Sequence, residues 1–232
     1  MISRVQFKPN QSLPAFQDVI ASVYGVPDDR LYSMWDLVSH QQRFAMRALK
    51  GMRKKDAGKL KSNLLISFAW LMAVANRLRI DLEEEIWARF PNSCSYCAKR
   101  PCACRSLHLK RRRTPSTMQA KDRPKTLAGY QRMFAAIYPT EKRTLAEAGV
   151  HVAEEVGEIN EALHSYLGQH QPKQFQAIGE ELADFASCLF GVANSADIDV
   201  AGGLAAMFKN NCHVCHKVPC TCSFGFVASL KT

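Results

Sequence analysis

An internal duplication is the feature that most constrains how this chain can fold. Four cysteines spaced Cys-x2-Cys-x4-Cys-x-Cys occur at 94–104 and again at 212–222, and the second set follows the first by 118 residues. Further upstream the offset becomes 114, which relates 12–24 to 126–138. Repetition at a nearly fixed spacing indicates two copies of one folding unit.

Each copy is expected to be all-α, with four helices followed by a cysteine knuckle. Apolar residues recur at helical spacing, as Val152, Val156 and Ile159 do, and no strand pattern of any length occurs. Short helices that each carry an apolar stripe predict an antiparallel bundle. In the second copy the predicted helices cover about 126–138, 144–166, 172–195 and 199–209.

Local signals set the predicted ends of these helices. Tyr138-Pro139 closes the first helix, because the residue before a proline disfavours the α region. Pro172 suits the first turn of the third helix. Asp199 is the predicted N-cap of the fourth helix, and Asp81 takes the same part in the first copy.

The predicted domains are the first copy at 1–105, a basic linker at 106–125 and the second copy at 126–232. The linker contains Lys110-Arg111-Arg112-Arg113 and Thr114-Pro115-Ser116 but few apolar residues, which predicts an exposed tether. A basic run of this kind can also contact nucleic acid. Both interpretations of the linker stay open.

Two groups of carboxylates distinguish the second copy. Glu155 and Glu158 stand three residues apart, as do Glu181 and Asp184, so each pair lies on one face of its helix. If the two helices pack antiparallel, the four carboxylates meet. Carboxylates that lie this close together repel one another, so a cation is expected between them. Oxygen ligands suit a hard divalent metal, and we expect Mg²⁺ shared with substrate phosphates.

The first copy provides an internal comparison. Its residues at the four equivalent positions are Gln41, Phe44, Asn63 and Ile66, none of which is a carboxylate. The first copy therefore cannot hold a hard cation in the same way. The acids are not needed to form the helices, which indicates that they serve function.

The acidic motifs also resemble those of a known family. Glu-Glu-x-x-Glu at 154–158 followed by Glu-x-x-Asp at 181–184 resembles the all-α nucleoside triphosphate pyrophosphohydrolases, the MazG-like superfamily. The resemblance covers about 125–210, and the first copy matches as a degenerate repeat. It implies two tandem MazG-like four-helix units. It also implies Mg²⁺-dependent hydrolysis of a nucleoside triphosphate to a monophosphate and pyrophosphate.

The resemblance implies roles for further residues. Glu155, Glu158, Glu181 and Asp184 are the expected Mg²⁺ ligands, and Glu154 is an outer-shell group or the base for the attacking water. Asn194 and Lys209 sit where the family often places substrate contacts, and His151 could meet a phosphate. Each of these three is also an ordinary surface or helix residue, and Asn76 repeats Asn194 in the copy without acids. Family members commonly form dimers, so we expect a homodimer or an intrachain pseudo-dimer.

The cysteines predict two structural zinc sites. Each set offers four thiolates, the number in a closed tetrahedral zinc site. Disulfides and iron–sulfur clusters are the alternatives, and His213 or His216 could replace one sulfur ligand, although Ser95 and Ala98 stand there in the first copy. Cys188 is left over and is expected in the core. The predicted ligands are Cys94, Cys97, Cys102 and Cys104, and Cys212, Cys215, Cys220 and Cys222.

Charge and hydropathy limit the remaining function classes. Residues 1–113 hold 21 Lys+Arg against 9 Asp+Glu, and 114–232 hold 10 against 12. The basic first half suits an anionic partner or forms a solvated surface. Neither a membrane span nor a secretory signal is evident, so we expect a cytoplasmic protein without a membrane partner. The competing functions are a zinc-containing nucleic-acid-binding protein and a non-catalytic interaction module.

Overall fold

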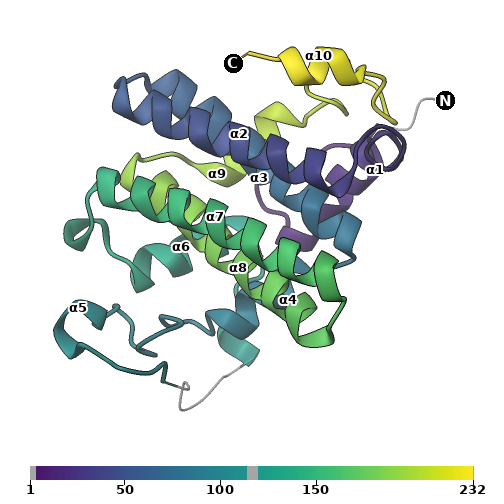
Figure 1. Ribbon diagram of the computed structural model, residues 1–232. Helices are drawn as coiled ribbons and strands as arrows, with labels where there is room; N and C mark the ends of the chain where they lie inside the picture. The colour runs from purple at the N-terminus through teal and green to yellow at the C-terminus, as the bar shows by residue number, and fades with distance from the viewer. Residues whose placement is uncertain (1–3, 114–119, 232) are drawn as a thin grey trace. The chain divides into compact units, whose positions relative to one another are not determined.

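A computed structural model describes residues 4–113 and 120–231 of the chain (Figure 1). Every helix or strand element within those residues is a helix, which confirms the predicted all-α class. Within those residues, no helix combines the length and the hydropathy that a membrane span requires. Thr114-Pro115-Ser116 of the predicted linker lies outside the described residues.

The four helices predicted for the second copy are present nearly at their predicted bounds. They are α6 (Leu127–Ile137), α7 (Leu145–Gln169), α8 (Pro172–Ser195) and α9 (Val200–Met207). The side chains of Thr126, Thr144 and Asp199 accept hydrogen bonds from backbone N–H groups in the first turns of α6, α7 and α9. These caps satisfy amide groups that the helix itself leaves unpaired.

The first copy forms the equivalent helices. They are α1 (Leu13–Leu31), α2 (Met34–Arg53), α3 (Ala57–Leu78) and α4 (Leu82–Arg89). Ser12, Ser33 and Asp56 cap the first three of them. The shorter helices are α5 (Cys104–Leu107), η1 (Ala120–Asp122), η2 (Thr140–Lys142) and α10 (Phe224–Ser229).

The chain divides into two compact units, and their boundaries differ from the predicted ones. One unit combines the residues up to Leu82 with those from Ile198 onward, and the other is continuous from Glu83 to Asp197. Nearly all of α4 and the first cysteine cluster therefore pack with α6, α7 and α8. In turn, α9 and the second cluster pack with α1, α2 and α3. The predicted boundaries at 105 and 126 do not separate these units.

Equivalent hydrogen bonds fix this exchange in the two units. The backbone N–H of Cys102 donates to the carbonyl of Ile137 at 2.7 Å, and that of Cys220 donates to the carbonyl of Val23 at 2.8 Å. Ile137 and Val23 occupy equivalent positions in the two copies. The final segment of each copy therefore packs against helices of the other copy. A comparison of repeats cannot detect this, because the repeat offset is the same whichever copy a segment packs against.

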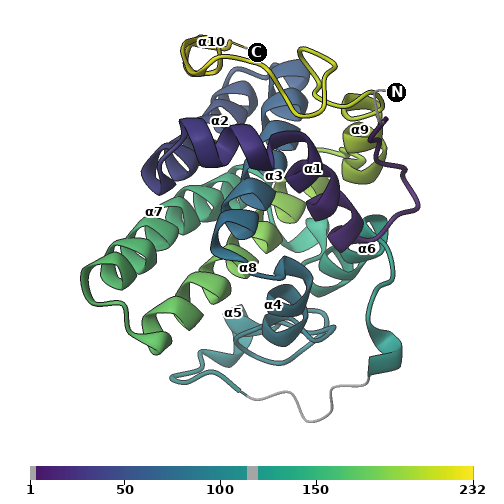
Figure 2. The same cartoon turned by 90° about the vertical axis from the view of Figure 1, so that its right-hand side faces the viewer.

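In the continuous unit, α7 and α8 form an antiparallel pair, and both views show them side by side (Figures 1 and 2). His170 ends α7 in the left-handed conformation, with φ 53°, and the chain turns back into α8. The core beside them includes Phe134, whose ring lies 5.1 Å from that of Phe90 and 5.4 Å from that of Phe190. Helix α4 thus contributes to this core through the segment that follows it.

In the discontinuous unit, α2 and α3 form the corresponding pair. Gly51 lets them approach closely, because a Cβ at this position would lie 2.6 Å from the backbone nitrogen of Leu60. The ring of Phe16 in α1 lies 5.0 Å from that of Phe7 and 5.6 Å from that of Phe208. Residues from both ends of the chain therefore share one core.

Candidate metal centre and adjoining cavity

Helices α7 and α8 bring three of the four predicted metal-binding carboxylates together. Ligand oxygens of Glu155, Glu181 and Asp184 lie within 4.8 Å of one another, a separation that one small cation could bridge. Glu158 lies one turn after Glu155 and outside this group of three, and its negative charge helps to raise the pKa of Glu181. The spacing of three residues on each helix produces this arrangement, since such residues share a helix face.

The carboxylates are held where their negative charges are poorly compensated. Burial is the main cause that raises the pKa of Glu155 to about 8 and that of Glu181 to about 7, and neighbouring carboxylates add to both shifts. Within the described residues, the Oε2 atoms of Glu155 and Glu181 are buried and have no hydrogen-bond partner. Buried acceptors of this kind, with oxygen donors alone, fit a hard divalent cation.

Arg89 is a member of this site that the sequence did not reveal. It ends α4, and its Nε donates to Oδ1 and Oδ2 of Asp184 at 3.1 and 3.0 Å. Its Nη2 also donates to Asp184, and its Nη1 donates to Glu180 at 2.7 Å. The Arg89 side chain is 11% exposed and that of Asp184 is 13% exposed, so the ion pair is largely shielded from water. Arg89 was missed because it belongs to the first copy, whereas the acids belong to the second, in which the residue equivalent to Arg89 is Met207.

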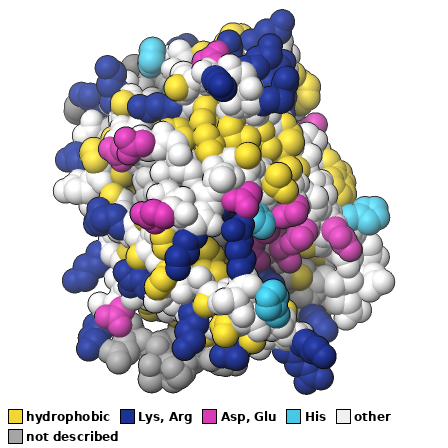
Figure 3. Space-filling view, turned by 90° about the vertical axis from the view of Figure 1, so that its left-hand side faces the viewer, with side chains coloured by type: hydrophobic (Ala, Val, Ile, Leu, Met, Phe, Trp, Pro, Cys, Tyr) yellow, Lys and Arg dark blue, Asp and Glu magenta, His cyan; other side chains and the backbone are white. Residues whose placement is uncertain are grey.

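A cavity of about 860 Å³ opens beside the carboxylates in the continuous unit. One part of its wall is formed by Glu155, Glu158 and Asp184. Basic side chains and the first cysteine cluster form another part, and Figure 3 shows acidic side chains gathered beside basic and histidine side chains on one face. This volume falls within the range of small-molecule sites. The basic residues that line it are Arg105, Arg112, Lys142 and Arg143.

The equivalent positions of the first copy are closed. Gln41, Phe44, Asn63 and Ile66 are all buried, each with at most 3% of its surface exposed. The cavity beside Phe44 and Ile66 measures about 60 Å³, is mostly apolar and is lined partly by Phe226 of α10. In the first copy, apolar groups therefore fill the corresponding space, which agrees with the sequence comparison of the two copies.

The remaining predicted site residues occupy different places. Glu154 is exposed and lies 2.9 Å from Nδ1 of His151, which lines the cavity. Asn194 stands ten residues after Asp184 on α8, about 15 Å along the helix axis. The side-chain amide of Asn194 donates to the carbonyl of Gln131 at 3.2 Å. Asn76 makes the same contact with Gln17 at 3.1 Å, so the repeated asparagines brace equivalent helix pairs.

Lys209 lies in the discontinuous unit, whereas the carboxylates lie in the continuous one. The backbone carbonyl of Lys209 accepts hydrogen bonds from the Arg4 side chain at 3.4 and 3.2 Å. Its side chain is exposed. Lys209 as a substrate contact thus stays a prediction from the family resemblance.

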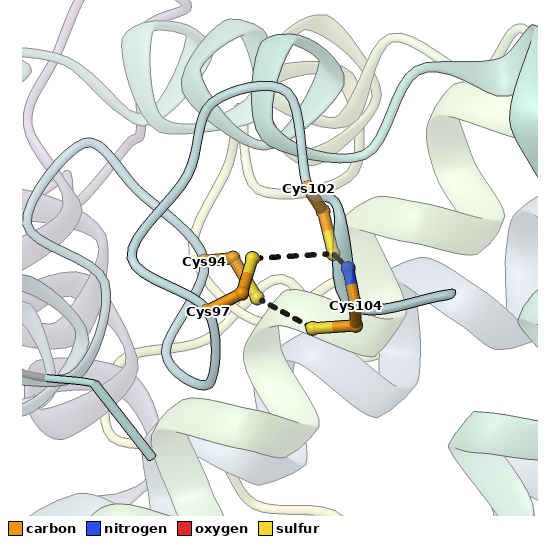
Figure 4. Close-up of side chains that lie close together, drawn as sticks. All are labelled: Cys94, Cys97, Cys102 and Cys104. Atoms are coloured by element: carbon orange, nitrogen blue, oxygen red, sulfur yellow. Dashed lines mark hydrogen bonds between the residues drawn. The ribbon is translucent and has the colours of Figure 1, made fainter. Parts of the chain in front are cut away.

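The first cysteine cluster has the arrangement of a zinc site. The four sulfurs of Cys94, Cys97, Cys102 and Cys104 lie within 4.8 Å of one another, and they point toward a common centre (Figure 4). The Sγ atoms of Cys94 and Cys104 are 3.6 Å apart, and those of Cys97 and Cys102 are 3.9 Å apart. Tetrahedral Zn–S bonds place sulfurs about 3.8 Å apart. These separations are too long for disulfides.

The second cluster repeats this geometry. The sulfurs of Cys212, Cys215, Cys220 and Cys222 also lie within 4.8 Å of one another. Backbone N–H groups donate to the sulfurs at equivalent places, from Tyr96 to Cys94 and from Val214 to Cys212, both at 3.4 Å. Nδ1 of His213 is hydrogen-bonded to the hydroxyl of Tyr24 at 3.0 Å, which favours four sulfur ligands. Each cluster could bind one zinc ion.

Comparison of this chain with protein-family models, with curated proteins and with solved structures found no match.

Proposed function

We propose that the protein is a Mg²⁺-dependent nucleoside triphosphate pyrophosphohydrolase that produces a nucleoside monophosphate and pyrophosphate. The observation that carries this proposal is the pairing of opposite charges around one cavity. Glu155, Glu158 and Asp184 line it together with Lys142 and Arg143. The carboxylates suit a divalent cation, and the basic groups suit the phosphates that such a cation accompanies. The resemblance of the acidic motifs at 154–158 and 181–184 to those of the MazG-like superfamily supports the same reaction.

The side chains around the cavity would have different roles in this reaction. Glu155, Glu158, Glu181 and Asp184 would hold Mg²⁺, which when bound withdraws charge from phosphoryl oxygens and orients a water molecule. Arg89 holds Asp184 in place through its ion pair. Glu154 would act as an outer group through its hydrogen bond to His151. The first cysteine cluster forms a wall of the cavity and would exclude bulk water there.

The exchange of segments gives the first copy a part in this reaction. Arg89 and the first cysteine cluster belong to the copy without acids, yet they line the site of the copy that has them. We therefore propose that the second copy carries the metal ligands and that the first copy completes the cavity. The two copies act together in place of two separate subunits.

The proposal is tested by measuring pyrophosphate release from a panel of nucleoside triphosphates with Mg²⁺. Glu181→Gln should lower kcat by at least about 100-fold, because it removes a charged metal ligand. Glu161→Gln is the matched control, since Glu161 is an exposed acid on α7. Equal activity of Glu181→Gln and the wild type would count against the proposed site, and no release from any nucleotide would exclude the reaction.

A nucleic-acid-binding role predicts a different result in the same samples. Binding through the basic residues would give a shift with DNA or RNA that weakens steeply with salt. It would not depend on Glu181. Such binding without pyrophosphate release would replace the proposed function with the nucleic-acid-binding one.

A further inference from the structure

Arg143 is placed in the cavity by the segment that leads into α7. Residues Thr140–Lys142 form the short helix η2, and the backbone N–H of Arg143 donates to the carbonyl of Thr140 at 3.3 Å. The next residue, Thr144, is the N-cap of α7 and forms a capping box with Glu147. The backbone of Arg143 is therefore held between η2 and α7, and α7 is also the helix that carries Glu155 and Glu158.

The Arg143 guanidinium is enclosed on two sides. Its central carbon lies 5.8 Å from the centre of the Tyr138 ring. On another side it packs against Gly191 of α8, where an added Cβ would come within 3.3 Å of Nη1 and Nη2. A glycine at this position leaves the space that the guanidinium occupies. The packing orients the group more firmly than an exposed arginine is oriented.

The Arg143 side chain nevertheless lacks hydrogen-bond partners. Its Nε and Nη2 atoms are buried, and neither one donates to any group in the part of the chain that the structure describes. This differs from Arg89, which contacts two carboxylates, and from Arg105, which contacts Glu147 at 2.5 Å. Buried N–H groups without an acceptor are costly, so an anion is expected beside Nε and Nη2 of Arg143.

The two unsatisfied groups line the same cavity. Glu155, with its unpaired carboxylate oxygen, and Arg143, with its unpaired guanidinium nitrogens, both form part of the wall. One requires a cation and the other requires an anion. A metal-complexed polyphosphate supplies both in a single ligand. Lys142 lines the cavity next to Arg143 and adds positive charge at that end.

We infer that Arg143 is a phosphate-binding residue, which holds one phosphate group of a di- or triphosphate while another lies at the carboxylates. A planar guanidinium presents paired N–H groups that match two phosphate oxygens, and this geometry distinguishes it from a lysine. The inference that Arg143 binds phosphate stands on the cavity alone. Its application to a nucleotide rests on the proposed function.

The first experiment measures binding of inorganic pyrophosphate to the full-length, zinc-loaded protein by calorimetry, with and without Mg²⁺. Arg143→Met should weaken the affinity by at least about 10-fold, because it removes charged hydrogen bonds. Arg143→Lys keeps the charge and should weaken it less. Arg132→Met is the matched control, since Arg132 is an exposed arginine of the same unit. Equal affinity for pyrophosphate in the wild type and in Arg143→Met would overturn the inference.

The second experiment compares ligands and uses steady-state kinetics. Arg143→Lys should raise KM for a nucleoside triphosphate more than it changes kcat, and a nucleoside monophosphate should bind Arg143→Lys and the wild type equally. Arg143→Lys also carries the test if Arg143→Met does not fold. An unchanged KM in an active Arg143→Lys enzyme would overturn the inference but leave the proposed reaction. Arg143-dependent pyrophosphate binding without nucleotide hydrolysis would do the reverse.

Discussion

Glu154 and Glu155 show how neighbouring residues of one type acquire different properties. Glu154 is exposed and contacts His151, whereas Glu155 faces the other carboxylates and is partly buried. Burial raises the pKa of Glu155 to about 8, from an ordinary value of 4.5. The difference arises from the 100° turn between consecutive residues of a helix, which directs the two side chains to different surroundings.

This shift predicts how stability depends on pH in the Mg²⁺-free protein. Because the folded-state pKa of Glu155 is raised, the folded chain holds an extra proton between about pH 4.5 and pH 8. Stability should therefore fall as pH rises through that window, and Glu181 should add to the fall up to about pH 7. Thermal unfolding at pH 6 and pH 8 should show a smaller loss in Glu155→Gln than in the wild type.

Glu154→Gln is the control for this measurement and should keep the wild-type dependence on pH. Added Mg²⁺ should raise Tm more at pH 8 than at pH 6, because it competes with protons for the same oxygens. A Tm of the wild type that increases steadily from pH 6 to pH 8 without metal would contradict the assignment of a raised pKa.

Arg89 allows a second prediction for a single residue. Arg89→Met leaves Asp184 shielded from water without its partner, so the free energy of unfolding should fall by about 2–4 kcal/mol. Mg²⁺ should restore part of this loss by supplying a replacement cation. Denaturant unfolding measures both effects. Arg105→Met, which removes an ion pair whose arginine is 76% exposed, should change the free energy of unfolding far less than Arg89→Met does.

Single residues also show where prediction from sequence succeeded and where it failed. The convergence of Glu155, Glu181 and Asp184 was predictable because residues three apart lie on the same face of a helix, whereas their role as metal ligands stays a prediction. Arg89 and Arg143 were not, because their importance depends on which buried partners they have or lack. An isolated arginine carries no periodic signal, and only the packed structure distinguishes it from a surface arginine.

At the level of elements, the helices themselves were largely predictable. Thr144, Pro172 and Asp199 each marked the start of a helix, and the structure confirms all three starts. These signals are local, since a cap or a first-turn proline acts within one turn of helix. Pairing of helices depends in addition on small residues at the places where two backbones approach.

Gly51 provides a prediction about helix pairing. Gly51→Ala should lower the free energy of unfolding by about 1–3 kcal/mol, because the new methyl group would press on the backbone of α3 at Leu60. Gly25→Ala makes the same chemical change in α1, where nothing lies within 4 Å. It should be neutral or should stabilise by up to about 1 kcal/mol, because alanine favours helix. Denaturant unfolding should therefore show a loss of stability in Gly51→Ala and none in Gly25→Ala.

The cysteine clusters lead to a prediction about metal content. The purified wild type should contain two zinc ions per chain, since each cluster offers four thiolates. Cys97→Ser should reduce this to about one, and the lost ion should loosen the wall of the cavity that the first cluster forms. Cys188→Ser is the control, because that thiol is buried outside both clusters. Elemental analysis that finds two zinc ions in Cys97→Ser would contradict four-sulfur ligation.

At the level of the whole molecule, the exchanged segments could not be predicted. The repeat offset relates Cys94 to Cys212 equally well whether each cluster packs on its own copy or on the other. The energetic difference lies in tertiary contacts, such as those of Cys102 with Ile137 and Cys220 with Val23. Local sequence signals do not record contacts of this kind.

A cleavage experiment tests the exchange. A protease site inserted between 113 and 120 would produce two fragments, each of which contains part of both units. The fragments should therefore stay associated in native buffer and separate only in denaturant, as gel filtration would show. Fragment 126–232 expressed alone should lack a stable fold, because residues 83–113 are missing from its unit. Two fragments that separate at once would instead support folding of each copy by itself.

The division into a continuous and a discontinuous unit has a consequence for how the chain is made. The ribosome delivers residues from the N-terminus, so α1, α2 and α3 emerge first, yet their unit also needs the residues from Ile198 onward. Everything in the unit from Glu83 to Asp197 is available earlier. The unit that begins second can therefore finish folding first, and α1, α2 and α3 complete their unit only after the residues from Ile198 onward have been synthesised.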